Sequence, residues 1–470
     1  MTETELRAQG PGDATAVSDE DIAWTFTELE AEVARLAPGC ADGVRAALDS
    51  GPRFTAVLLA CLRAKGRLAT LLPGDVTSRE AGHYLGLAPT GRLIVSAERL
   101  GQRYREAGAK DTFTFDETPS CAPTADSAHT PSDVAILQFT SGTTGYPKGV
   151  LLTEANLRAN FAQSGEFLEG FRGQPVFCAL PQFHATGLAV TLEHLCFASP
   201  VHFANRFDPA SHLKRMNEHR CVGLIAGPDY LRLLLQLGLV RPAHLPHLTD
   251  IEIGTAAVSS ELLRDLRANL PGVRIHIRYG LTEAFGALTR RSIDGGDELP
   301  PKGDVGRALP GVELRTVAGE LQARAGTCTR QSLDRAGAPL DHLDVEGFLA
   351  TGDLAELRGA VVQLLGRRST FIKTHGHRVD PEEVADLLRE VPGVGDAAVL
   401  GAPDPISGQK VVAFVEPAPG HTLPEPTDLR ATCDRGLSPF KRPSRFVALD
   451  TMPRTRAGNP DLTALLQLLD

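Results

Sequence analysis

The chain has 470 residues, 42% of them hydrophobic and 23% charged, and its formal net charge at pH 7 is −10. This length exceeds what one hydrophobic core usually serves, so two or more domains are expected. The acidic balance argues against a nucleic-acid partner, because contact with phosphate backbones requires a basic face. The opening residues contain no apolar run of the kind found in secretion signals or membrane spans, which predicts a cytoplasmic protein with no membrane partner.

The helix and strand patterns are weaker in the first part of the chain than in the rest. An amphipathic stretch at residues 28–36 is expected to form a helix with Thr27 as its N-cap. A second helix, rich in small residues, is expected at residues 56–64. Residues 118–132 are rich in Pro, Ser, Thr and Ala, a composition that favours a surface connection.

From residue 134 onward, short apolar runs alternate with longer helical patterns. This alternation is typical of parallel strands joined by crossover helices, so an α/β fold is predicted. The expected strands are residues 134–139, 176–180, 222–226, 251–254 and 275–279. Two of the intervening stretches, 230–239 and 261–270, have a length suited to crossover helices.

The pattern changes again near residue 366. The remaining residues predict one helix and several short strands, which together indicate a small α+β domain. The helix is expected at residues 381–390 and the strands at 397–400, 411–415 and 445–449. We therefore predict a large domain over residues 1–368 and a small one over residues 369–470.

A loop rich in glycine and hydroxyl groups follows the apolar run at 134–139. Residues 140–149 read TSGTTGYPKG. The glycines let backbone N–H groups approach an anion closely, the hydroxyls can bond phosphate oxygens, and Lys148 supplies a positive charge. The spacing differs from that of the P-loop of nucleoside triphosphatases, in which Ser or Thr follows the lysine. The residues predicted to bind phosphate are Thr140, Ser141, Gly142, Thr143, Thr144, Gly145 and Lys148.

This loop resembles the signature loop of the adenylate-forming superfamily, which includes acyl-CoA synthetases, peptide-synthetase adenylation domains and firefly luciferase. The resemblance continues in the family's order through residues 254–257, 279–283, 310–311, 319–321, 351–353 and 366–367. It implies a large N-terminal α/β domain of several sheets that binds AMP and the acyl group. It also implies a small, mobile C-terminal α+β domain that rotates as a lid.

The resemblance implies roles around a bound adenylate. The ring of Tyr279 would stack on adenine, and Thr282 would bond the α-phosphate. Glu283 would hold Mg²⁺, with Thr144 as a second metal-binding residue, and Asp353 would bond the ribose hydroxyls. A strand end that carries an aromatic ring, a hydroxyl and a carboxylate suits a nucleotide and a metal ion. The other implied nucleotide contacts are Gly254, Thr255, Ala256, Gly280 and Arg367.

Residues 183–188 indicate the branch of the family. Peptide-synthetase adenylation domains usually carry an aspartate after the phenylalanine, whereas His184 follows Phe183 here. A histidine at this place is typical of acyl and aryl ligases, where it would gate or line the acyl pocket. The alternative is a histidine that only begins a helix. The expected acyl-pocket residues are Phe183, His184, Gly187, Tyr230 and Ala256.

Residues 373–379 resemble the segment that lines the pantetheine tunnel after the small domain rotates. Lys373, Gly376 and Arg378 are the implied coenzyme A contacts: Gly376 leaves room for the thiol arm, and Arg378 could reach a phosphate. This segment favours a thioester product over luciferase-type oxidation. It leaves open whether the acceptor is free CoA or a carrier protein.

The C-terminal segment departs from the family pattern. Family members carry a Gly-Lys pair there, and the lysine bridges the attacking carboxylate and the phosphates, but Asn459 occupies its place in this chain. No lysine follows Lys441, so only Arg454 or Arg456 could substitute. Losing one placed group of this kind costs on the order of 10²–10³ in rate. Adenylation should be severely weakened, whereas thioester formation, which uses the other face of the small domain, should survive.

The hinge carries a second departure, because Ser369 stands where the family usually has Asp or Lys. Serine tolerates several backbone conformations, so rotation remains possible.

The sequence thus predicts an acid–thiol ligase specialised for thioester formation. Its substrates are a small acyl group and CoA, its other ligands are AMP or ATP and Mg²⁺, and a separate adenylating enzyme could supply acyl-AMP. Within the family, this pattern resembles the non-adenylating acyl-CoA ligases of secondary metabolism. Two alternatives remain, a conventional AMP-forming synthetase and an inactive protein that binds acyl-adenylate.

Overall fold

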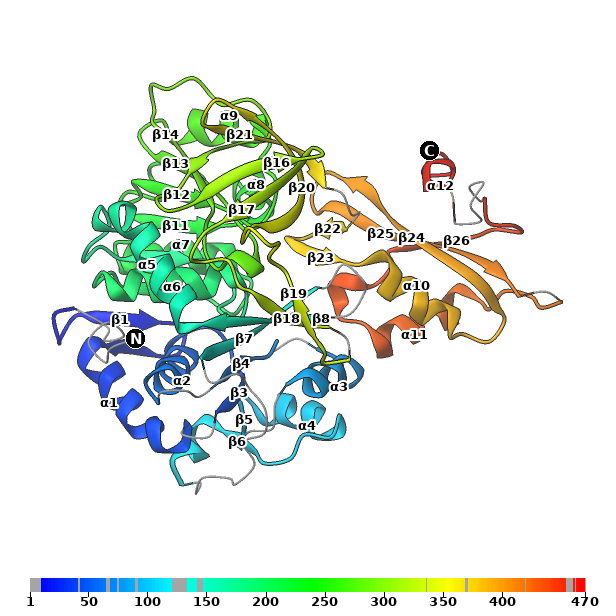
Figure 1. Ribbon diagram of the computed structural model, residues 1–470, viewed down its shortest axis with the longest axis horizontal. Helices are drawn as coiled ribbons and strands as arrows, with labels where there is room; N and C mark the ends of the chain where they lie inside the picture. Colours follow the sequence, from blue (N-terminus) through cyan, green and yellow to red (C-terminus); the bar gives the residue numbers. More distant parts are fainter. Residues whose placement is uncertain are drawn as a thin grey trace.

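The computed structural model describes most of the chain. The described residues are 10–40, 43–64, 68–73, 76–88, 92–120, 133–141, 147–334, 336–367, 371–418, 420–453, 460 and 462–469. Within them, the chain forms three β-sheets with helices packed on their faces (Figure 1). None of the helices in these ranges combines the length and the hydropathy that crossing a bilayer requires.

The largest sheet has 13 strands and contains four of the five strands predicted between residues 134 and 279. Its order is β16 (Glu313–Val317), β17 (Glu320–Arg324), β20 (Leu349–Arg358), β21 (Val361–Arg367), β15 (Asp304–Ala308), β14 (Thr289–Ile293), β13 (Arg274–Tyr279), β12 (Asp250–Ile253), β11 (Gly223–Ala226), β9 (Val176–Cys178), β10 (Val201–Phe203), β1 (Thr15–Ser18) and β2 (Ala23–Thr25). The run from β13 to β1 is parallel. Its helices are α5 (Glu154–Glu169), α6 (Ala185–Cys196), α7 (Pro209–Glu218), α8 (Pro228–Gln236) and α9 (Ser260–Asn269).

The second sheet has eight strands and carries the predicted phosphate loop. Its order is β19 (Pro339–Asp341), β18 (Gln331–Leu333), β8 (Pro147–Thr153), β7 (Val134–Ser141), β4 (Ala69–Leu71), β3 (Val44–Ala47), β5 (Arg92–Val95) and β6 (Thr112–Thr114). Its helices are α1 (Phe26–Leu36), α2 (Pro52–Arg63), α3 (Ser78–Leu87) and α4 (Glu98–Glu106). Strands β7 and β8 are antiparallel neighbours, and the predicted loop spans the end of the first and the start of the second.

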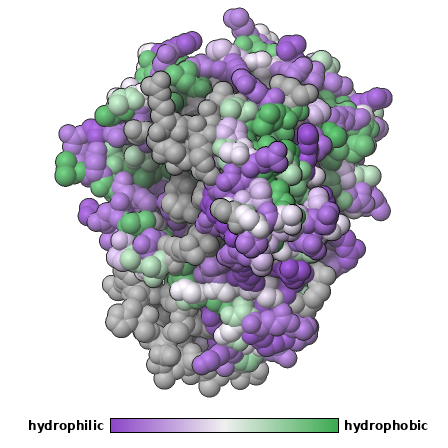
Figure 2. All heavy atoms as spheres, turned by 90° about the vertical axis from the view of Figure 1, so that its right-hand side faces the viewer, coloured by the Kyte–Doolittle hydropathy of each residue, from purple (hydrophilic) through white to green (hydrophobic). Residues whose placement is uncertain are grey.

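The third sheet is formed by the C-terminal part of the chain and has its own hydrophobic core. Its strands are β23 (His377–Val379), β22 (Ile372–Thr374), β25 (Gly408–Pro417) and β24 (Val394–Asp404), with β26 (Arg445–Ala448) beside β25. Its helices are α10 (Pro381–Arg389), α11 (Pro426–Gly436) and α12 (Leu462–Leu466). Hydrophilic side chains predominate on the molecular face at this side, with apolar ones interspersed (Figure 2).

This architecture confirms the predicted α/β fold with a small α+β C-terminal part. The domain boundary predicted at 368/369 falls outside the described residues and stays a prediction.

One predicted N-cap is wrong, because α1 begins at Phe26 and its N-cap is Thr25 rather than Thr27. Thr25 and Glu28 form a capping box, in which the N–H of Glu28 donates to Oγ1 of Thr25 and the N–H of Thr25 donates to the Glu28 carboxylate. The spacing Thr-x-x-Glu starts at Thr25, and this reciprocal pairing decides where the helix starts.

A buried cluster of charges joins α3 to the C-terminal sheet. Lys441 lies in a short 3₁₀ helix, η4 (Pro439–Lys441), with its Nζ atom 2.9 Å from Oε1 of Glu80 and 2.8 Å from Oε1 of Glu383. The N–H and hydroxyl of Ser438 also donate to the Glu80 carboxylate. The side chains of Lys441 and Glu80 are only 7% and 5% exposed, so the cluster is shielded from water.

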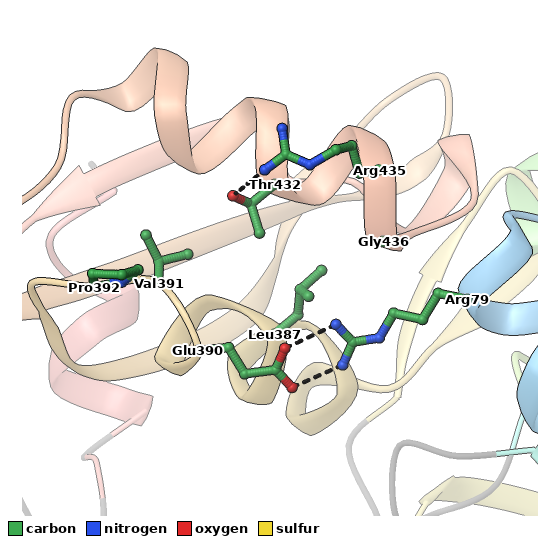
Figure 3. A pocket seen from close by; sticks show the side chains of 8 residues that line it. All are labelled: Arg79, Leu387, Glu390, Val391, Pro392, Thr432, Arg435 and Gly436. Atoms are coloured by element: carbon green, nitrogen blue, oxygen red, sulfur yellow. Dashed lines mark hydrogen bonds and ion pairs between the residues drawn. The ribbon is translucent and has the colours of Figure 1, made fainter.

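A second contact between the same parts lies closer to solvent. Arg79 of α3 makes two parallel hydrogen bonds, of 2.9 and 2.8 Å, with the carboxylate of Glu390, the residue after α10 (Figure 3). A pocket beside this pair is bordered by α10 and α11. Together with Lys441, the pair fixes where the third sheet lies against the second.

Candidate active site

The predicted site residues of the large sheet gather at the carboxyl ends of its parallel strands. His184 follows β9, Tyr230 follows β11, and residues 255–256 and 280–283 follow β12 and β13. The carboxyl ends of parallel strands form one edge of a sheet, which is where such sheets bind ligands. Predictions made from separate motifs therefore meet at one edge.

Tyr279 and Asp353 are in direct contact. The hydroxyl of Tyr279, at the end of β13, donates a 2.8 Å hydrogen bond to the Asp353 carboxylate on β20. Both residues are buried. The hydroxyl of Thr351 accepts from the N–H of Asp353, and Glu320 accepts from the N–H of Gly352, so β17 and β20 hold the carboxylate in place. The ring predicted to stack on adenine and the acid predicted to bond ribose thus lie side by side.

In the loop after β12, Thr255 has a strained backbone conformation and a buried hydroxyl without a hydrogen-bond partner among the described residues. Thr255 adopts φ of +70°, which is uncommon for a β-branched residue, and its Oγ1 atom is buried with no hydrogen-bond partner among the described residues. The N–H of Ala256 donates to the carbonyl of Gly254 at 2.9 Å, and the N–H of Gly254 donates back to β11. A buried hydroxyl without a partner fits a ligand with a polar atom at this position.

Residues 280–283 turn sharply away from β13. A side chain at Gly280 would collide with the carbonyl of Gly286, so only glycine fits there. Thr282 and Glu283 begin a 3₁₀ turn, and the carbonyl of Glu283 accepts from the N–H of Thr329 at 2.8 Å.

Three charged side chains, those of Glu283, Lys148 and Asp341, lie near His342 beside the predicted phosphate loop. Burial lowers the pKa of His342, the nearby Lys148 lowers it further, and the nearby Glu283 opposes the shift. The ring of His342 is 2.7 Å from the hydroxyl of Ser332 on β18, which pairs with β8. A carboxylate such as that of Glu283 is a ligand type that Mg²⁺ uses together with phosphate oxygens and water. Among the described residues, no group of three His, Cys, Asp or Glu could hold a metal ion by itself.

The phosphate hairpin can be followed only at its base. Thr140 pairs with Lys148, and Ser141 with Pro147. The side chains of Thr140 and Ser141, and Gly142, Thr143, Thr144 and Gly145 entirely, lie outside the described residues. So do the side chain of Arg367 and the residues Ser369 and Asn459.

His184 occupies the N-cap position of α6, but its side chain makes no capping hydrogen bond. Its ring lies beside those of Phe183 and His377, with centroids 4.4 and 6.0 Å apart. The carbonyl of Phe183 accepts a 3.0 Å hydrogen bond from the buried Gln138 of β7, which ties this loop to the second sheet. Burial lowers the pKa of His184 to about 3, with help from His377 and Arg378, so the imidazole is neutral at physiological pH.

The other predicted acyl-pocket residues surround the same loops. Gly187 packs so closely on the carbonyl of Pro181 that no side chain fits. The hydroxyl of Tyr230 is 2.7 Å from Nδ1 of His212, which holds the ring in place at the start of α8. A side chain at Gly227, the N-cap of α8, would lie 3.2 Å from Oγ1 of Thr255.

The hairpin of β22 and β23 carries the predicted CoA contacts. Lys373 and Arg378 are paired across it, and Gly376 lies at its exposed tip with φ of +76° and open space around its Cα. The ring of His377 stacks on that of Phe440 in η4, with centroids 4.0 Å apart and planes 17° apart. Sequence reasoning did not single out His377, Phe440, His342 or Gln138, because their contacts depend on the fold.

Two family models match the chain. The model described as AMP-binding enzyme matches residues 4–325, and the model described as AMP-binding enzyme C-terminal domain matches residues 383–459. The chain belongs to the AMP-binding enzyme family. This confirms the superfamily inferred from the ordered motifs.

Several relatives of this AMP-binding enzyme carry CoA-ligase names. The chain is 30% identical to 3-[(3aS,4S,7aS)-7a-methyl-1,5-dioxo-octahydro-1H-inden-4-yl]propanoyl:CoA ligase of Mycobacterium tuberculosis. This match covers 97% of the chain and 96% of the relative. The chain is also 28% identical to 4-coumarate–CoA ligase-like 9 of Arabidopsis thaliana and to luciferin 4-monooxygenase of Nipponoluciola cruciata, and it spans 60% and 64% of their lengths.

Solved structures of one enzyme, o-succinylbenzoate CoA synthetase from Bacillus subtilis, resemble this chain to different degrees. The TM-score is 0.86 to a double mutant bound to its product analogue OSB-NCoA, at 25% identity over 99% of this chain and 98% of the other. It is 0.68 to the complex with the acyl-adenylate OSB-AMP, at 26% identity over the same shares. The two scores therefore differ although both structures belong to one enzyme.

Proposed function

We propose that this chain is an acyl-CoA ligase that transfers an acyl group from acyl-AMP to the thiol of coenzyme A. The observation that carries the proposal is the position of the β22–β23 hairpin, whose His377 lies against His184. The higher TM-score to the product-analogue complex than to the acyl-adenylate complex supports the same arrangement.

The residues around the edge of the large sheet would hold the adenylate half of the substrate. The ring of Tyr279 offers a stacking face and Asp353 a carboxylate for ribose, while Thr282 and Lys148 offer a hydroxyl and a charge to the phosphate. Bound Mg²⁺, with Glu283 among its ligands, would neutralise phosphate charge.

The acyl half would extend toward His184 and the start of α8. The neutral ring of His184, with Phe183 beside it, gives an apolar wall that excludes water from the mixed anhydride. The hairpin closes this region from the side of the C-terminal sheet. The thiol arm would enter past Gly376, where the open backbone leaves room.

We further propose that the enzyme is specialised for this second half-reaction and takes acyl-AMP from a separate adenylating enzyme. The support is the sequence at Asn459, where an amide replaces the cation that adenylation needs. The charged cluster of Lys441, Glu80 and Glu383 supports it too, because the cluster stabilises the arrangement in which the hairpin faces the site.

A second candidate is a conventional synthetase that performs both half-reactions. Lys148 and Glu283 lie together beside His342, as binding of ATP with Mg²⁺ would require. An arginine, Arg454 or Arg456, would then replace the missing lysine.

The test compares two substrates with the same purified protein. One reaction contains 2-succinylbenzoate or 4-coumarate with ATP, Mg²⁺ and CoA, and the other contains the preformed adenylate of the same acid with CoA. We expect thioester from the adenylate at a rate at least about 10²-fold above that from the free acid. Equal rates would refute the specialisation, and the absence of thioester from any adenylate would refute the ligase.

Asn459→Lys is the companion variant, and its expected result is a gain in pyrophosphate exchange with the free acid. An unchanged rate of pyrophosphate exchange would show that Asn459 is not what limits adenylation.

A further inference from the structure

A pocket of about 310 Å³ lies between the carboxyl-terminal ends of α10 and α11 (Figure 3). Arg79 of α3 forms one of its walls, and the other lining residues belong to the C-terminal domain. This volume is at the lower end of the range for small-molecule sites. None of the lining residues is among the predicted adenylate, acyl or CoA contacts, so the pocket is a separate feature of the molecule.

Apolar groups form one side of this pocket. Leu387 and Val391 belong to the hydrophobic core of the C-terminal sheet, and Pro392 follows them in the lining. A Cβ atom at Gly436 would lie 2.8 Å from Cδ2 of Leu387, so a side chain there would push against the wall that glycine leaves open. The pocket therefore suits a ligand with an apolar body.

The charged groups of the lining leave one positive charge without an ion-pair partner. Arg79 and Glu390 neutralise each other, because two hydrogen bonds join the guanidinium to the carboxylate. Arg435 donates a 3.2 Å hydrogen bond to the hydroxyl of Thr432, and no carboxylate of the described residues forms an ion pair with it. A guanidinium carries its N–H groups in a planar fork that matches a carboxylate. The side chains thus favour an anionic ligand.

The ends of the two helices have a smaller, opposing effect. The carboxyl-terminal end of a helix carries a partial negative charge. At the end of α11, the carbonyl groups of Asp434 and Leu437 accept hydrogen bonds of 3.0 and 2.9 Å from Arg442, which offsets this charge. Arg435 lies in the same last turn, so its full positive charge decides the sign at the pocket.

We propose that this pocket binds a small monocarboxylate with an apolar body and that binding stabilises the docking of the C-terminal domain on α3. The pocket is complete only while the wall formed by Arg79 is in place. A ligand that binds the complete pocket better than the open one shifts the equilibrium toward the docked arrangement. The effect on catalysis rests on the proposed function, in which this arrangement forms the thioester.

The binding test uses 4-fluorobenzoate as the probe and fluorine NMR of the purified full-length protein. We expect a dissociation constant on the order of 1 mM, as is usual for a ligand of this size. The neutral 4-fluorobenzamide has nearly the same shape and should bind at least about 10-fold more weakly, because it lacks the charge that Arg435 would meet.

Three variants locate the probe. Arg435→Gln should weaken binding of 4-fluorobenzoate by at least about 10-fold. Arg430→Gln is the matched control, because Arg430 is an exposed arginine of α11 outside the lining, and its affinity should stay within about two-fold of wild type. Probe bound at the active site would be common to both proteins, so the difference between them reports the pocket. Thr432→Trp should fill the pocket and prevent binding there.

The docking test uses Glu80→Gln, in which Lys441 loses a charged partner and the docked arrangement is less favoured. Spin labels on α3 and α11 report the distance between the domains. About 10 mM 4-fluorobenzoate should restore the docked distances. It should also speed single-turnover thioester formation from acyl-AMP and CoA by up to about 10-fold, as mass action gives for a dissociation constant of about 1 mM. With Arg435→Gln added, the probe should do neither.

The outcomes separate the pocket from the proposed function. Equal affinity of wild type and Arg435→Gln, or unchanged binding to Thr432→Trp, would show that the carboxylate does not bind in this pocket. Binding that leaves the spin-label distances of Glu80→Gln unchanged would refute the effect on docking. If the probe binds and the distances respond but no adenylate gives thioester, the pocket stands and the proposed function fails instead.

Discussion

At the scale of single residues, Tyr279 would contribute to nucleotide binding in two ways. Its ring would stack on adenine, and its hydroxyl orients the Asp353 carboxylate through a hydrogen bond. Tyr279→Phe keeps the ring that would stack on adenine and removes the 2.8 Å bond that orients the carboxylate. A hydrogen bond to a charged acceptor contributes about 1.5–3 kcal/mol, so AMP affinity should fall by roughly 10- to 100-fold. Titration calorimetry with AMP measures this.

The control for this prediction is Tyr279→Leu, which also removes the ring. It should bind AMP more weakly than the phenylalanine variant. Equal affinity of wild type and Tyr279→Phe would show that the bond does not position Asp353 for ribose.

Motif order led us to predict Tyr279 and Asp353 as site residues, because each lies in a segment that resembles the family's. It could not predict their hydrogen bond or the ring contacts of His184, His377 and Phe440. These contacts join residues separated by many positions, and their spacing in the sequence carries no information about the approach of β20 to β13 or of η4 to β23.

At the scale of elements, α3 connects the N-terminal part of the chain to the C-terminal sheet through Glu80. One oxygen of this carboxylate closes the capping box with Thr77, and the other accepts from Lys441. The same residue therefore starts the helix and anchors the neighbouring domain. The spacing of Thr77 and Glu80 is a helix signal that could have located α3 in the sequence.

Glu80→Gln should loosen this contact between domains. The substitution leaves the buried ammonium of Lys441 with Glu383 alone, and losing a charged hydrogen-bond partner costs about 1.5–3 kcal/mol. The docked arrangement should then be roughly 10- to 100-fold less favoured, and thioester formation from acyl-AMP should slow accordingly. Stopped-flow kinetics measures the rate, and distances between spin labels on α3 and α11 report the docking.

Glu169→Gln is the matched control, because Glu169, the last residue of α5, forms an exposed pair with Arg172 in the turn that follows. This variant should change neither the rate of thioester formation nor the distances between the spin labels. A Glu80 variant that keeps wild-type distances would show that the cluster does not hold the domains together.

The same contact should depend on pH. Burial alone would raise the pKa of Glu80, but Lys441 and Ser438 hold it below its usual value of 4.5. A carboxylate with a lowered pKa stabilises the docked state above 4.5, and this contribution is lost as the pH falls through the lowered value. The interdomain distances should therefore be constant from pH 7 to about 5 and should lengthen below about 4.5. Constant distances down to pH 3 would contradict the prediction.

At the scale of the whole molecule, the hydrophobic pattern predicted the α/β body and the small C-terminal part but not their relative position. The C-terminal sheet and the central part of the large sheet each bury their own apolar side chains, and this leaves a repeating pattern in the sequence. The contact between the sheets depends on a few polar residues, such as Arg79 with Glu390. Such pairs look like ordinary surface charges in a sequence, so the arrangement required the structure.

A cross-link tests whether this arrangement is the one that forms the thioester. In Arg79→Cys/Glu390→Cys, the new cysteines replace a bidentate ion pair at the edge of the interface, and a bismaleimide would join them. The seven cysteines in the described residues include six buried ones, so labelling should favour the engineered pair. We expect the linked protein to convert acyl-AMP and CoA within a few-fold of the unlinked protein in a single turnover.

The same cross-link should have the opposite effect on adenylation. In an Asn459→Lys background, any gained pyrophosphate exchange requires the C-terminal domain to present its other face, which the link prevents. Linking should therefore abolish exchange while sparing thioester formation. Loss of both activities would place thioester formation in a different arrangement, whereas retention of both would show that one arrangement serves both half-reactions.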